Sequence, residues 1–494
     1  MPVHRFRSSL AVLAGVAIFF AVLHTEFLLA WVCLVPFFMS LDGVSLRAAA
    51  RLGFLTGAVV STLSFYWMIA GAETFTGSSV WYGVAVFALC TVAFSLYWAV
   101  LTILYARLTR RGADAFLRPV LLAACLWVCA EAALQWLARG MPWFLFRTGN
   151  ALAENLYAIQ PLSWVGVHGA TFVVVAVNAA IARCLIRCDW KRLVWPAAAI
   201  ALYFCIGWSL LQAQPESTGE GFTLAILSGQ IPPSVQWDSA SGNQLVSRLL
   251  DLNHAAAAQK PDMALWSESA IPWTYRPDDD LVAEITRGST MTHILGMNTA
   301  VSDGVVNNSA YLLGAGAVTH YDKQALLLGI EQPFFGRLIP FFSSNGFAVQ
   351  PGPNASPLQT PFGPAGIMIC NESAVPKAAA SAVRRGARYL LNMSNDGWFA
   401  DTYLVGLHFY NVRLRAVETR RDIAVNSNLG ISGLVRASGR IEEGRRSDDP
   451  YVSIVKVQPR EGETLAVRLP WLPVALCGLY IIVSLLLPYK NLQT

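Results

Sequence analysis

The stretch GIMICNESAVP, residues 366–376, places one thiol, Cys370, at the end of a short apolar run and follows it with polar residues and a carboxylate. A run of this length bounded by polar residues predicts a buried β-strand. A cysteine at such a strand end is by default an inert core residue. A nucleophilic thiol would instead need a base to take its proton and a cation or dipole to favour the thiolate and the oxyanion. What the rest of the chain brings to Cys370 therefore separates the two interpretations.

The composition predicts a membrane protein. Of the 494 residues, 55% are hydrophobic and only 14% are charged, which is too apolar for an ordinary soluble domain. Apolar runs near the length of about 20 residues that crosses a bilayer predict about eight spans. A cleaved signal peptide is the alternative for the first run, but no small-residue cleavage site follows it and further spans do. The runs are residues 10–24, 27–41, 52–70, 79–108, 117–137, 162–186, 193–213 and 469–488.

Lysine and arginine in the short connections predict the orientation, because cytoplasmic loops are enriched in them. Alternate loops differ in their lysine and arginine content, and the loops that are poor in these residues carry Glu26, Glu73, Arg139, Arg147 and Glu154. We therefore expect both termini in the cytoplasm and the long segment between the last two spans on the periplasmic side of the inner membrane. The loops that are rich in lysine and arginine carry Arg5, Arg7, Arg47, Arg51, Arg107, Arg110, Arg111, Arg118, Arg183, Arg187, Lys191, Arg192 and Lys490.

Three domains follow from this pattern: a membrane domain over residues 1–213, an extracytoplasmic domain over 214–468, and a final span with a short tail over 469–494. In the extracytoplasmic segment, strand-like runs such as FTLAILSG and ARYLLNMSND alternate with helical patterns such as NQLVSRLLDLNHAAAAQK. Roughly 250 residues are enough for one sizeable core. We expect an α/β or sandwiched α/β fold there.

Cys370 is the only cysteine of the extracytoplasmic segment among nine in the chain, so a disulfide within that segment is impossible. No Cys/His spacing suggests a metal. Cys184 and Cys188 lie one helical turn apart, which favours membrane packing over a metal pair. The eight cysteines in or beside predicted spans are Cys33, Cys90, Cys125, Cys129, Cys184, Cys188, Cys205 and Cys477.

Two other strand ends of the same segment carry charged residues. LWSESAIPW, residues 265–273, places Glu268 after an apolar strand, and THYDKQALLLGIEQPFFG, residues 319–336, presents Lys323 after a strand-like stretch. Either charge alone is more often a solvated loop residue. Three strand ends that deliver a glutamate, a lysine and a cysteine in this order form a stronger signal, because they supply the base, the cation and the nucleophile that thiol chemistry needs.

This order resembles the nitrilase superfamily, whose Glu-Lys-Cys triad lies on a four-layer αββα sandwich. Over nearly the whole chain, the sequence is similar to the apolipoprotein N-acyltransferase family, which has eight spans and a nitrilase-like domain between the last two. GMPW, residues 140–143, also resembles the family's Gly-Phe-Pro-Trp loop. The similar blocks, in order, are SGQIPPSVQWD, WSESAIP, YDK, MICNES, NMSNDGWFAD, HFYNVRLRAVETRR and NSNLGISGLVRASGRI.

The resemblance implies that Cys370 is the acylated nucleophile, Glu268 the general base and Lys323 the cation that stabilises the oxyanion. A free thiol is only a few per cent ionised at neutral pH, so it gains from both charged neighbours. The backbone N–H of Asn371 could complete the oxyanion hole. No cofactor is implied.

The resemblance extends to three further residues, each with an alternative structural role. Glu331, eight residues after Lys323, matches a second essential glutamate but could be a loop charge. Glu372 matches the glutamate of the family's Cys-Tyr-Glu but could be a cap or an ion-pair partner. Trp237 matches a tryptophan near the pocket entrance but could be a core aromatic.

Two departures fall around the expected acyl pocket. The stretch LLLGIEQPFFGRLIP keeps Glu331 but lacks the family's Pro-Phe-Gly lead-in, and Asn371 replaces the family's tyrosine. A divergent branch associated with plasmid conjugal transfer therefore also fits the sequence. Residues 326–342 are apolar and rich in Gly and Pro, as a lid that dips into lipid would need, although several of them could fill a core.

The resemblance implies a ping-pong reaction. A phospholipid acyl chain would pass to Cys370 as a thioester and then to the α-amino group of a lipoprotein's diacylglyceryl-cysteine. The rival enzyme is a membrane-tethered amidase or nitrile hydrolase, in which water ends the reaction. A non-enzymatic scaffold has no need of three separated polar groups at strand ends. We expect no nucleic-acid partner, because the net charge of +5 is small for this length and the basic clusters lie in predicted cytoplasmic loops.

Overall fold

The computed structural model describes most of the chain. The residues fall into two compact units, which are Met1–Leu137 with Trp143–Ala213 and Leu469–Thr494, and Ala138–Pro142 with Gln214–Arg468. The described residues are 6–71, 79–110, 115–138, 141, 146–214, 220–232, 242–287, 289–314, 316–327, 331 and 348–486.

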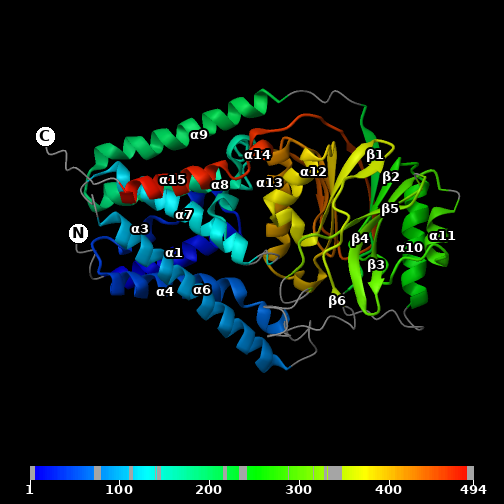
Figure 1. The fold of residues 1–494 in the computed structure, drawn as a ribbon, viewed down its shortest axis with the longest axis horizontal. Coiled ribbons are helices and arrows are strands. Elements are labelled where there is room, and N and C mark those ends of the chain that lie inside the picture. Colours follow the sequence, from blue (N-terminus) through cyan, green and yellow to red (C-terminus); the bar gives the residue numbers. More distant parts are fainter. Residues whose placement is uncertain are drawn as a thin grey trace. The chain divides into compact units, whose positions relative to one another are not determined.

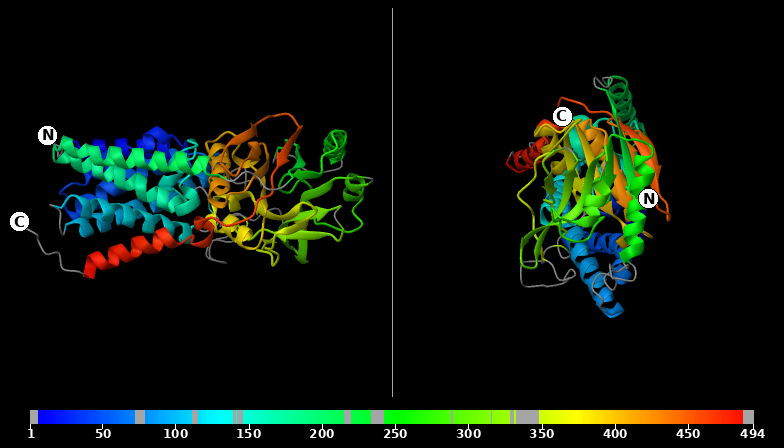
Figure 2. Two further views of the ribbon diagram at one scale, coloured as in Figure 1. Left: turned by 90° about the horizontal axis from the view of Figure 1, so that it is seen from above. Right: turned by 90° about the vertical axis from the view of Figure 1, so that its right-hand side faces the viewer.

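The first unit is helical, and its long helices run alongside one another (Figures 1 and 2). Within the described residues, five helices are long and apolar enough to cross a membrane, and shorter apolar helices overlap the other three predicted spans. A membrane domain of about eight spans is therefore consistent with the structure. The elements are α1 (Arg7–Ile18), η2 (Phe19–Leu23), α2 (Phe27–Ala30), α3 (Val35–Ser40), α4 (Leu46–Phe65), α6 (Val80–Thr109), α7 (Leu117–Leu137), η4 (Thr148–Leu152), α8 (Leu162–Ile186), η5 (Trp190–Leu193), α9 (Val194–Gln212) and α15 (Leu472–Leu486).

The second apolar run is not one continuous helix. It forms α2 and α3 with a turn between them, and Pro36 lies in the first turn of α3, where its missing N–H is tolerated. The side chain of Asn178 on α8 donates to the carbonyl of Ala30 and accepts from the amide of Leu34, both at 2.8 Å. These bonds satisfy backbone groups that the break would otherwise leave unpaired in an apolar surrounding.

A buried carboxylate, Glu131, lies within α7 at 4% exposure. Its Oε1 accepts from the indole of Trp127 at 3.0 Å and from the amide and the hydroxyl of Thr148 at 2.8 Å each. Its Oε2 accepts from the hydroxyl of Thr171 at 2.8 Å. A carboxylate at membrane depth needs such partners, and these bonds fasten η4 to α7 and α8.

The second unit contains two sheets. One has the strand order β13-β1-β2-β3-β4-β5 with β6 paired to β4, and the other has the order β12-β11-β10-β9-β8-β7. The strands of the first sheet are β1 (Phe222–Ser228), β2 (Met263–Trp266), β3 (Thr292–Ser302), β4 (Val305–Leu313), β5 (Thr319–Asp322), β6 (Ala348–Val349) and β13 (Tyr451–Val457). Those of the second are β7 (Leu358–Thr360), β8 (Gly363–Ile369), β9 (Tyr389–Asn395), β10 (Ile423–Asn428), β11 (Ser432–Val435) and β12 (Ile441–Arg445).

Helices cover the outer faces of both sheets, which gives four αββα layers (Figure 1). A core between the sheets joins Leu224, Ile226 and Leu265 of the first sheet to Ile369 and Leu391 of the second. Separate cores pack α10 and α11 against the first sheet, and α12 and α13 against the second. The predicted αββα sandwich is confirmed. The helices and short helical turns are α10 (Gly242–Ala257), α11 (Asp280–Thr286), η6 (Cys370–Ala374), α12 (Pro376–Arg384), η7 (Gly397–Phe399), α13 (Leu404–Thr419) and α14 (Leu465–Arg468).

Strand direction brings the carboxyl ends of β2, β5 and β8 to one edge of the sandwich. β2 is parallel to β3, and β5 runs in the same direction because it is antiparallel to β4, which is antiparallel to β3. In the second sheet β8, β9 and β10 are parallel. The amide of Asn395, at the end of β9, donates to the carboxylate of Glu268 just after β2, so the ends of both sheets meet.

Gly296 of β3 lies against the turn that carries Glu268. A Cβ at this position would lie 2.4 Å from the carbonyl oxygen of Ser267 and 2.7 Å from the amide nitrogen of Ser269. Both atoms belong to the backbone, so they can move only with the turn.

We expect Gly296→Ala to destabilise the α/β unit by about 1–3 kcal/mol, as overpacking does, and to lower the midpoint of thermal unfolding of the detergent-purified protein. Gly242→Ala is the matched control, because a Cβ there would meet no other described segment within 4 Å. An unchanged midpoint for Gly296→Ala would contradict the close approach of the two segments.

Candidate active site

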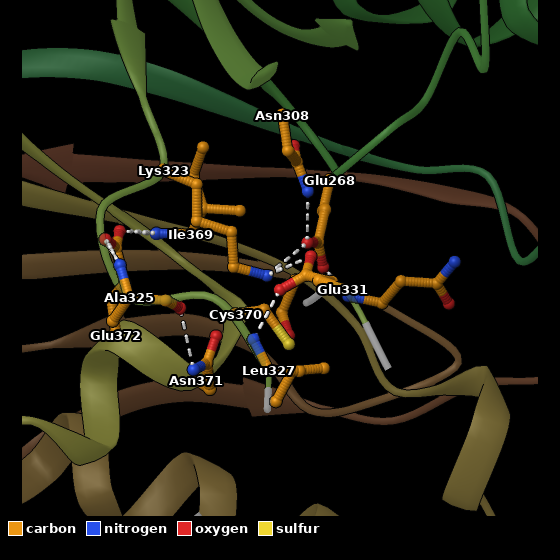
Figure 3. Close-up of polar contacts among 12 residues, drawn as sticks. Glu268, Asn308, Lys323, Ala325, Leu327, Glu331, Ile369, Cys370, Asn371 and Glu372 are labelled. Carbon is orange, nitrogen blue, oxygen red and sulfur yellow. Dashed lines mark hydrogen bonds and ion pairs between the residues drawn. The ribbon is translucent and has the colours of Figure 1, made fainter. Parts of the chain in front are cut away.

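The three charged or nucleophilic strand-end residues come together in the second unit (Figure 3). Glu268 follows β2, Lys323 follows β5, and Cys370 follows β8. The Lys323 ammonium lies 3.2 Å from Oε1 of Glu268, and the Cys370 side chain lies beside this pair. All three are buried. Two sheets and three distant parts of the chain therefore supply one cluster.

Lys323 is held by two carboxylates rather than one. Its Nζ lies 2.8 Å from Oε1 of Glu331, in addition to its contact with Glu268. Burial disfavours the charged form of Lys323, but the two carboxylates outweigh burial, and the pKa of the ammonium is raised well above its usual range. Lys323 is therefore a cation over the whole physiological pH range.

Glu268 is fixed through both of its carboxylate oxygens. The side-chain amide of Asn308 on β4 donates to Oε1 at 2.9 Å, and the backbone amide of Asn395 donates to Oε2 at 3.1 Å. The carbonyl of Asn308 also accepts from the amide of Lys323 at 2.8 Å. Asn308 therefore positions both charged members of the cluster. No sequence pattern indicates a role for Asn308, and Asn395 was visible only as part of the similar block NMSNDGWFAD.

Cys370 is the first residue of the short helical turn η6, directly after β8. Its φ is +50°, in the left-handed region that non-glycine residues rarely adopt. Its side chain is buried, and burial together with the negative charge of Glu268 raises the pKa of the thiol well above its usual value, although Lys323 opposes the shift. At rest, Cys370 is therefore a protonated thiol close to a carboxylate that can accept its proton.

Glu372 connects the nucleophile turn to the segment that follows β5. Its carboxylate accepts from the hydroxyl of Tyr321 at 3.0 Å, from the amides of Gln324 and Ala325 at 2.7 and 3.1 Å, and from the amide of Ile369 at 2.8 Å. Burial raises the pKa of Glu372, and these backbone donors oppose the rise. The contacts fit a residue that sets the distance between Lys323 and Cys370.

Asn371 and Glu331 make further contacts around the same turn. The side-chain amide of Asn371 donates to the carbonyl of Ala325 at 2.9 Å. The second oxygen of Glu331 accepts from the amide of Leu327 at 2.7 Å. Trp237 and most of the apolar stretch 326–342 lie outside the described residues, as does most of GMPW.

His408 of α13 is a further polar residue of the site, visible in the sequence only as the first residue of the similar block HFYNVRLRAVETRR. Its Nε2 lies 2.9 Å from the carbonyl oxygen of Cys370, and its Nδ1 lies 2.7 Å from Oδ1 of Asp396. Among the residues that the structure describes, no three His, Cys, Asp or Glu side chains are placed to share a metal ion. The described groups supply a thiol, a proton acceptor and fixed cations, which is the set that covalent acyl chemistry uses.

Comparison with known proteins gives two family matches. The apolipoprotein N-acyltransferase N-terminal domain matches residues 14–180, and the carbon-nitrogen hydrolase family matches residues 224–463. The apolipoprotein N-acyltransferase of Gloeobacter violaceus is 30% identical over 434 residues, which cover 83% of this chain and 80% of that protein. The protein of the same name from Geobacter metallireducens is 27% identical over 433 residues, which cover 84% of this chain and 82% of that protein.

The electrostatics of the cluster predict the effect of removing a carboxylate. Glu268→Gln deletes a negative charge that disfavours the thiolate, so the pKa of Cys370 should fall. Alkylation by iodoacetamide consumes the thiolate and should therefore begin at lower pH than in the wild type. The measurement is the extent of alkylation of the Cys370 peptide by mass spectrometry across a pH series.

Glu331→Gln should shift the profile in the same direction, because the charge of Glu331 also raises the pKa of Cys370. Glu284→Gln is the control, since Glu284 is exposed on α11 and pairs with Arg287. A shift of the Glu268→Gln profile to higher pH would contradict the arrangement.

Proposed function

The chain belongs to the apolipoprotein N-acyltransferase family, and from this premise we propose that it moves a phospholipid acyl chain through a thioester on Cys370 to the α-amino group of a lipoprotein's N-terminal diacylglyceryl-cysteine. The observation that carries the proposal is the buried cluster in which the Cys370 thiol lies beside Glu268 and a doubly paired Lys323. The family membership supplies the two substrates, and the cluster supplies the chemistry.

In the first half-reaction, the thiol of Cys370 passes its proton to Glu268 as sulfur attacks the ester carbonyl of the phospholipid. The carbonyl oxygen becomes an oxyanion, which the Lys323 ammonium and the backbone N–H of Asn371 stabilise. When this intermediate collapses, the carbon–oxygen bond of the ester breaks. The leaving alkoxide takes the proton back from Glu268, and lysophospholipid departs from a thioester.

In the second half-reaction, the amine of the acceptor attacks the thioester carbonyl, and the same two donors stabilise the new oxyanion. Glu268 removes a proton from the attacking nitrogen as the carbon–sulfur bond breaks. The sulfur leaves as thiolate, recovers that proton from Glu268, and an amide is the product. One carboxylate thus serves as base and acid in each half-reaction.

Glu331 has a defined part in this scheme. It supports the charge of Lys323 through a 2.8 Å contact and is itself fixed by the amide of Leu327. If Glu268 were its only carboxylate partner, the Lys323 ammonium would lose its counter-charge when Glu268 becomes protonated and would be freer to move. Glu331 therefore holds Lys323 in place while the proton moves.

We also propose an orientation for the chain, which is a membrane protein by its helices and its family. The lysine and arginine distribution supports cytoplasmic termini and a catalytic unit on the periplasmic side of the inner membrane. Phospholipid and lipoprotein acceptors are both anchored in that membrane, so the substrates and the enzyme would share one surface.

The proposed thioester predicts a specific change in mass. We expect intact-mass spectrometry of the detergent-purified protein, after incubation with phospholipid, to show an adduct of fatty-acyl mass that hydroxylamine removes. Cys370→Ser should lack this adduct. Cys205→Ser should keep it, because Cys205 is an exposed cysteine of α9 outside the cluster.

Labelled phospholipid and a diacylglyceryl-cysteine peptide separate transfer from hydrolysis. An N-acyl peptide supports the proposal, whereas free fatty acid with no acylated peptide would point to a membrane-tethered hydrolase. An unmodified wild-type protein that also releases no product would contradict both enzyme functions and favour a scaffold.

The proton-transfer role of Glu268 predicts opposite effects on two reactions of Cys370. In Glu268→Gln, thioester formation should fall by about 10²–10⁴-fold, which is the range for loss of a general acid or base. Alkylation of the same thiol at neutral pH should not fall, because the thiolate is easier to form. Single-turnover acylation and alkylation, measured side by side, check this. A parallel loss of both rates would show that the variant damages the thiol's surroundings rather than the proton transfer.

A further inference from the structure

His408 of α13 connects an aspartate to the backbone of the nucleophile. Its Nδ1 lies 2.7 Å from Oδ1 of Asp396, and its Nε2 lies 2.9 Å from the carbonyl oxygen of Cys370. The histidine side chain is 10% exposed and that of Asp396 is 3% exposed. Neither residue has a step in the acyl-transfer chemistry described above.

The two contacts define the protonation state of the ring. A carboxylate and a carbonyl oxygen are both acceptors, so both ring nitrogens must carry a proton for each contact to be a hydrogen bond. The hydroxyl of Ser394 donates to the same Asp396 oxygen at 3.1 Å, which fixes the carboxylate as an acceptor. Burial disfavours the imidazolium, but the Asp396 carboxylate, the Cys370 carbonyl and the charge of Glu268 outweigh burial and raise the pKa of His408.

These contacts also exclude His408 as the base for the thiol. Nδ1 is occupied by Asp396, and Nε2 is directed at the carbonyl of Cys370. A cysteine–histidine dyad would need a ring nitrogen within hydrogen-bond reach of the sulfur. The influence of His408 on the reaction must therefore pass through the peptide group.

The carbonyl that His408 contacts belongs to the Cys370–Asn371 peptide, and the N–H of that peptide is the proposed oxyanion donor. The described residues contain no cis peptide bond, so this C=O and N–H point in opposite directions within one plane. A donor that fixes the oxygen thereby fixes the direction of the N–H. A charged donor also polarises the peptide, which strengthens the hydrogen bond that the N–H can give.

The turn requires such a restraint. Cys370 has a φ of +50°, a conformation that costs about 1–3 kcal/mol for a non-glycine residue and persists only when its surroundings hold it. The hydroxyl of Ser373 donates to the same carbonyl at 3.1 Å, but Ser373 belongs to the turn itself. His408 restrains the turn from a separate helix, through the longest-range contact that this carbonyl makes among the described residues.

We propose that His408, paired with Asp396, is a positioning residue that orients and polarises the Asn371 N–H toward the oxyanion formed at Cys370. The inference rests on the proposed function for the identity of the acyl donor, but not for the chemistry, since any ester that acylates Cys370 passes through an oxyanion. The ring nitrogens of His408 are directed at Asp396 and at the Cys370 carbonyl rather than at the sulfur. It acts on the rate of acylation through one peptide plane.

Two reactions of the same thiol test this role. Acylation by a p-nitrophenyl fatty-acyl ester develops an oxyanion, whereas alkylation by iodoacetamide is a displacement at saturated carbon and develops none. Loss of one direct oxyanion donor costs about 10²–10³-fold. His408→Gln leaves the backbone N–H of Asn371 in place but removes its restraint, so its effect should be smaller. We expect the ratio of the acylation rate to the alkylation rate, measured at one pH, to fall by about 10–100-fold.

Asp396→Asn should lower the rate of acylation, because it removes the charge that holds the ring protonated while it preserves the shape of the site. The acylation rate rather than the ratio is compared for this variant, because the charge of Asp396 also raises the pKa of the Cys370 thiol and its removal favours alkylation by itself. His254→Gln is the matched control, since His254 is exposed on α10 of the same unit and should leave the ratio unchanged. Thermal unfolding of each variant shows whether it remains folded.

The outcomes distinguish this inference from the proposed function. A ratio that is unchanged in His408→Gln, whether both rates stay the same or fall in parallel, would overturn the role of His408. Acylation of wild-type Cys370 by the p-nitrophenyl ester but not by phospholipid would overturn the proposed acyl donor and leave the role of His408 supported by its ratio. Failure of both esters to acylate wild-type Cys370 would overturn both.

Discussion

The buried ammonium of Lys323 is the constraint on which the site depends. A charge removed from water is tolerated only with partners of opposite charge and good geometry. Lys323 has two, Glu268 and Glu331, and each carboxylate is itself fixed by a backbone amide, from Asn395 or from Leu327. Any change that withdraws one carboxylate leaves the ammonium less compensated, so the loops after β2, β5 and β9 are energetically tied to one another.

The two-sheet core makes this convergence possible because it fixes strand ends from distant parts of the chain. Asn428, at the end of β10, pairs with both the amide and the carbonyl of Ile231, at 2.8 and 2.7 Å, and also donates to the side chain of Asn395 at 3.0 Å. The segment after β1, the end of β10 and the amide that holds Glu268 are thus joined. Apolar side chains between the sheets, such as Ile226 and Leu391, supply the driving force for their packing.

Features that depend on a local sequence pattern could be predicted, whereas contacts between residues that lie far apart in the chain could not. Apolar runs and strand ends are local, so the membrane domain, an α/β domain and the order of Glu268, Lys323 and Cys370 could be predicted from pattern. The four-layer αββα arrangement was implied by the family resemblance. The break in the second apolar run is completed by Asn178, which lies 144 positions from Leu34, and no local pattern announces that contact. Asn308 and His408 are likewise defined only by which backbone or carboxylate atoms the fold brings to them. The contacts of Glu331 and Glu372 suit the roles proposed for them. The role of Asn371 is proposed for its backbone N–H, whereas the contact described for this residue is made by its side chain, and Trp237 lies outside the described residues.

A raised thiol pKa suits a transferase better than a permanently ionised thiolate. In the proposed reaction, a thiolate at rest would leave Glu268 without a proton to return to the lysophospholipid alkoxide, which is a poor leaving group unless it is protonated. A thiol that surrenders its proton only during attack keeps that proton within the site for the leaving group. Burial and the charge of Glu268 raise the pKa of the thiol, while in the proposed reaction Lys323 and the peptide that His408 contacts stabilise the charge that appears later. The site thus opposes negative charge on sulfur at rest and favours it on oxygen in the transition state, which is the difference that accelerates a reaction.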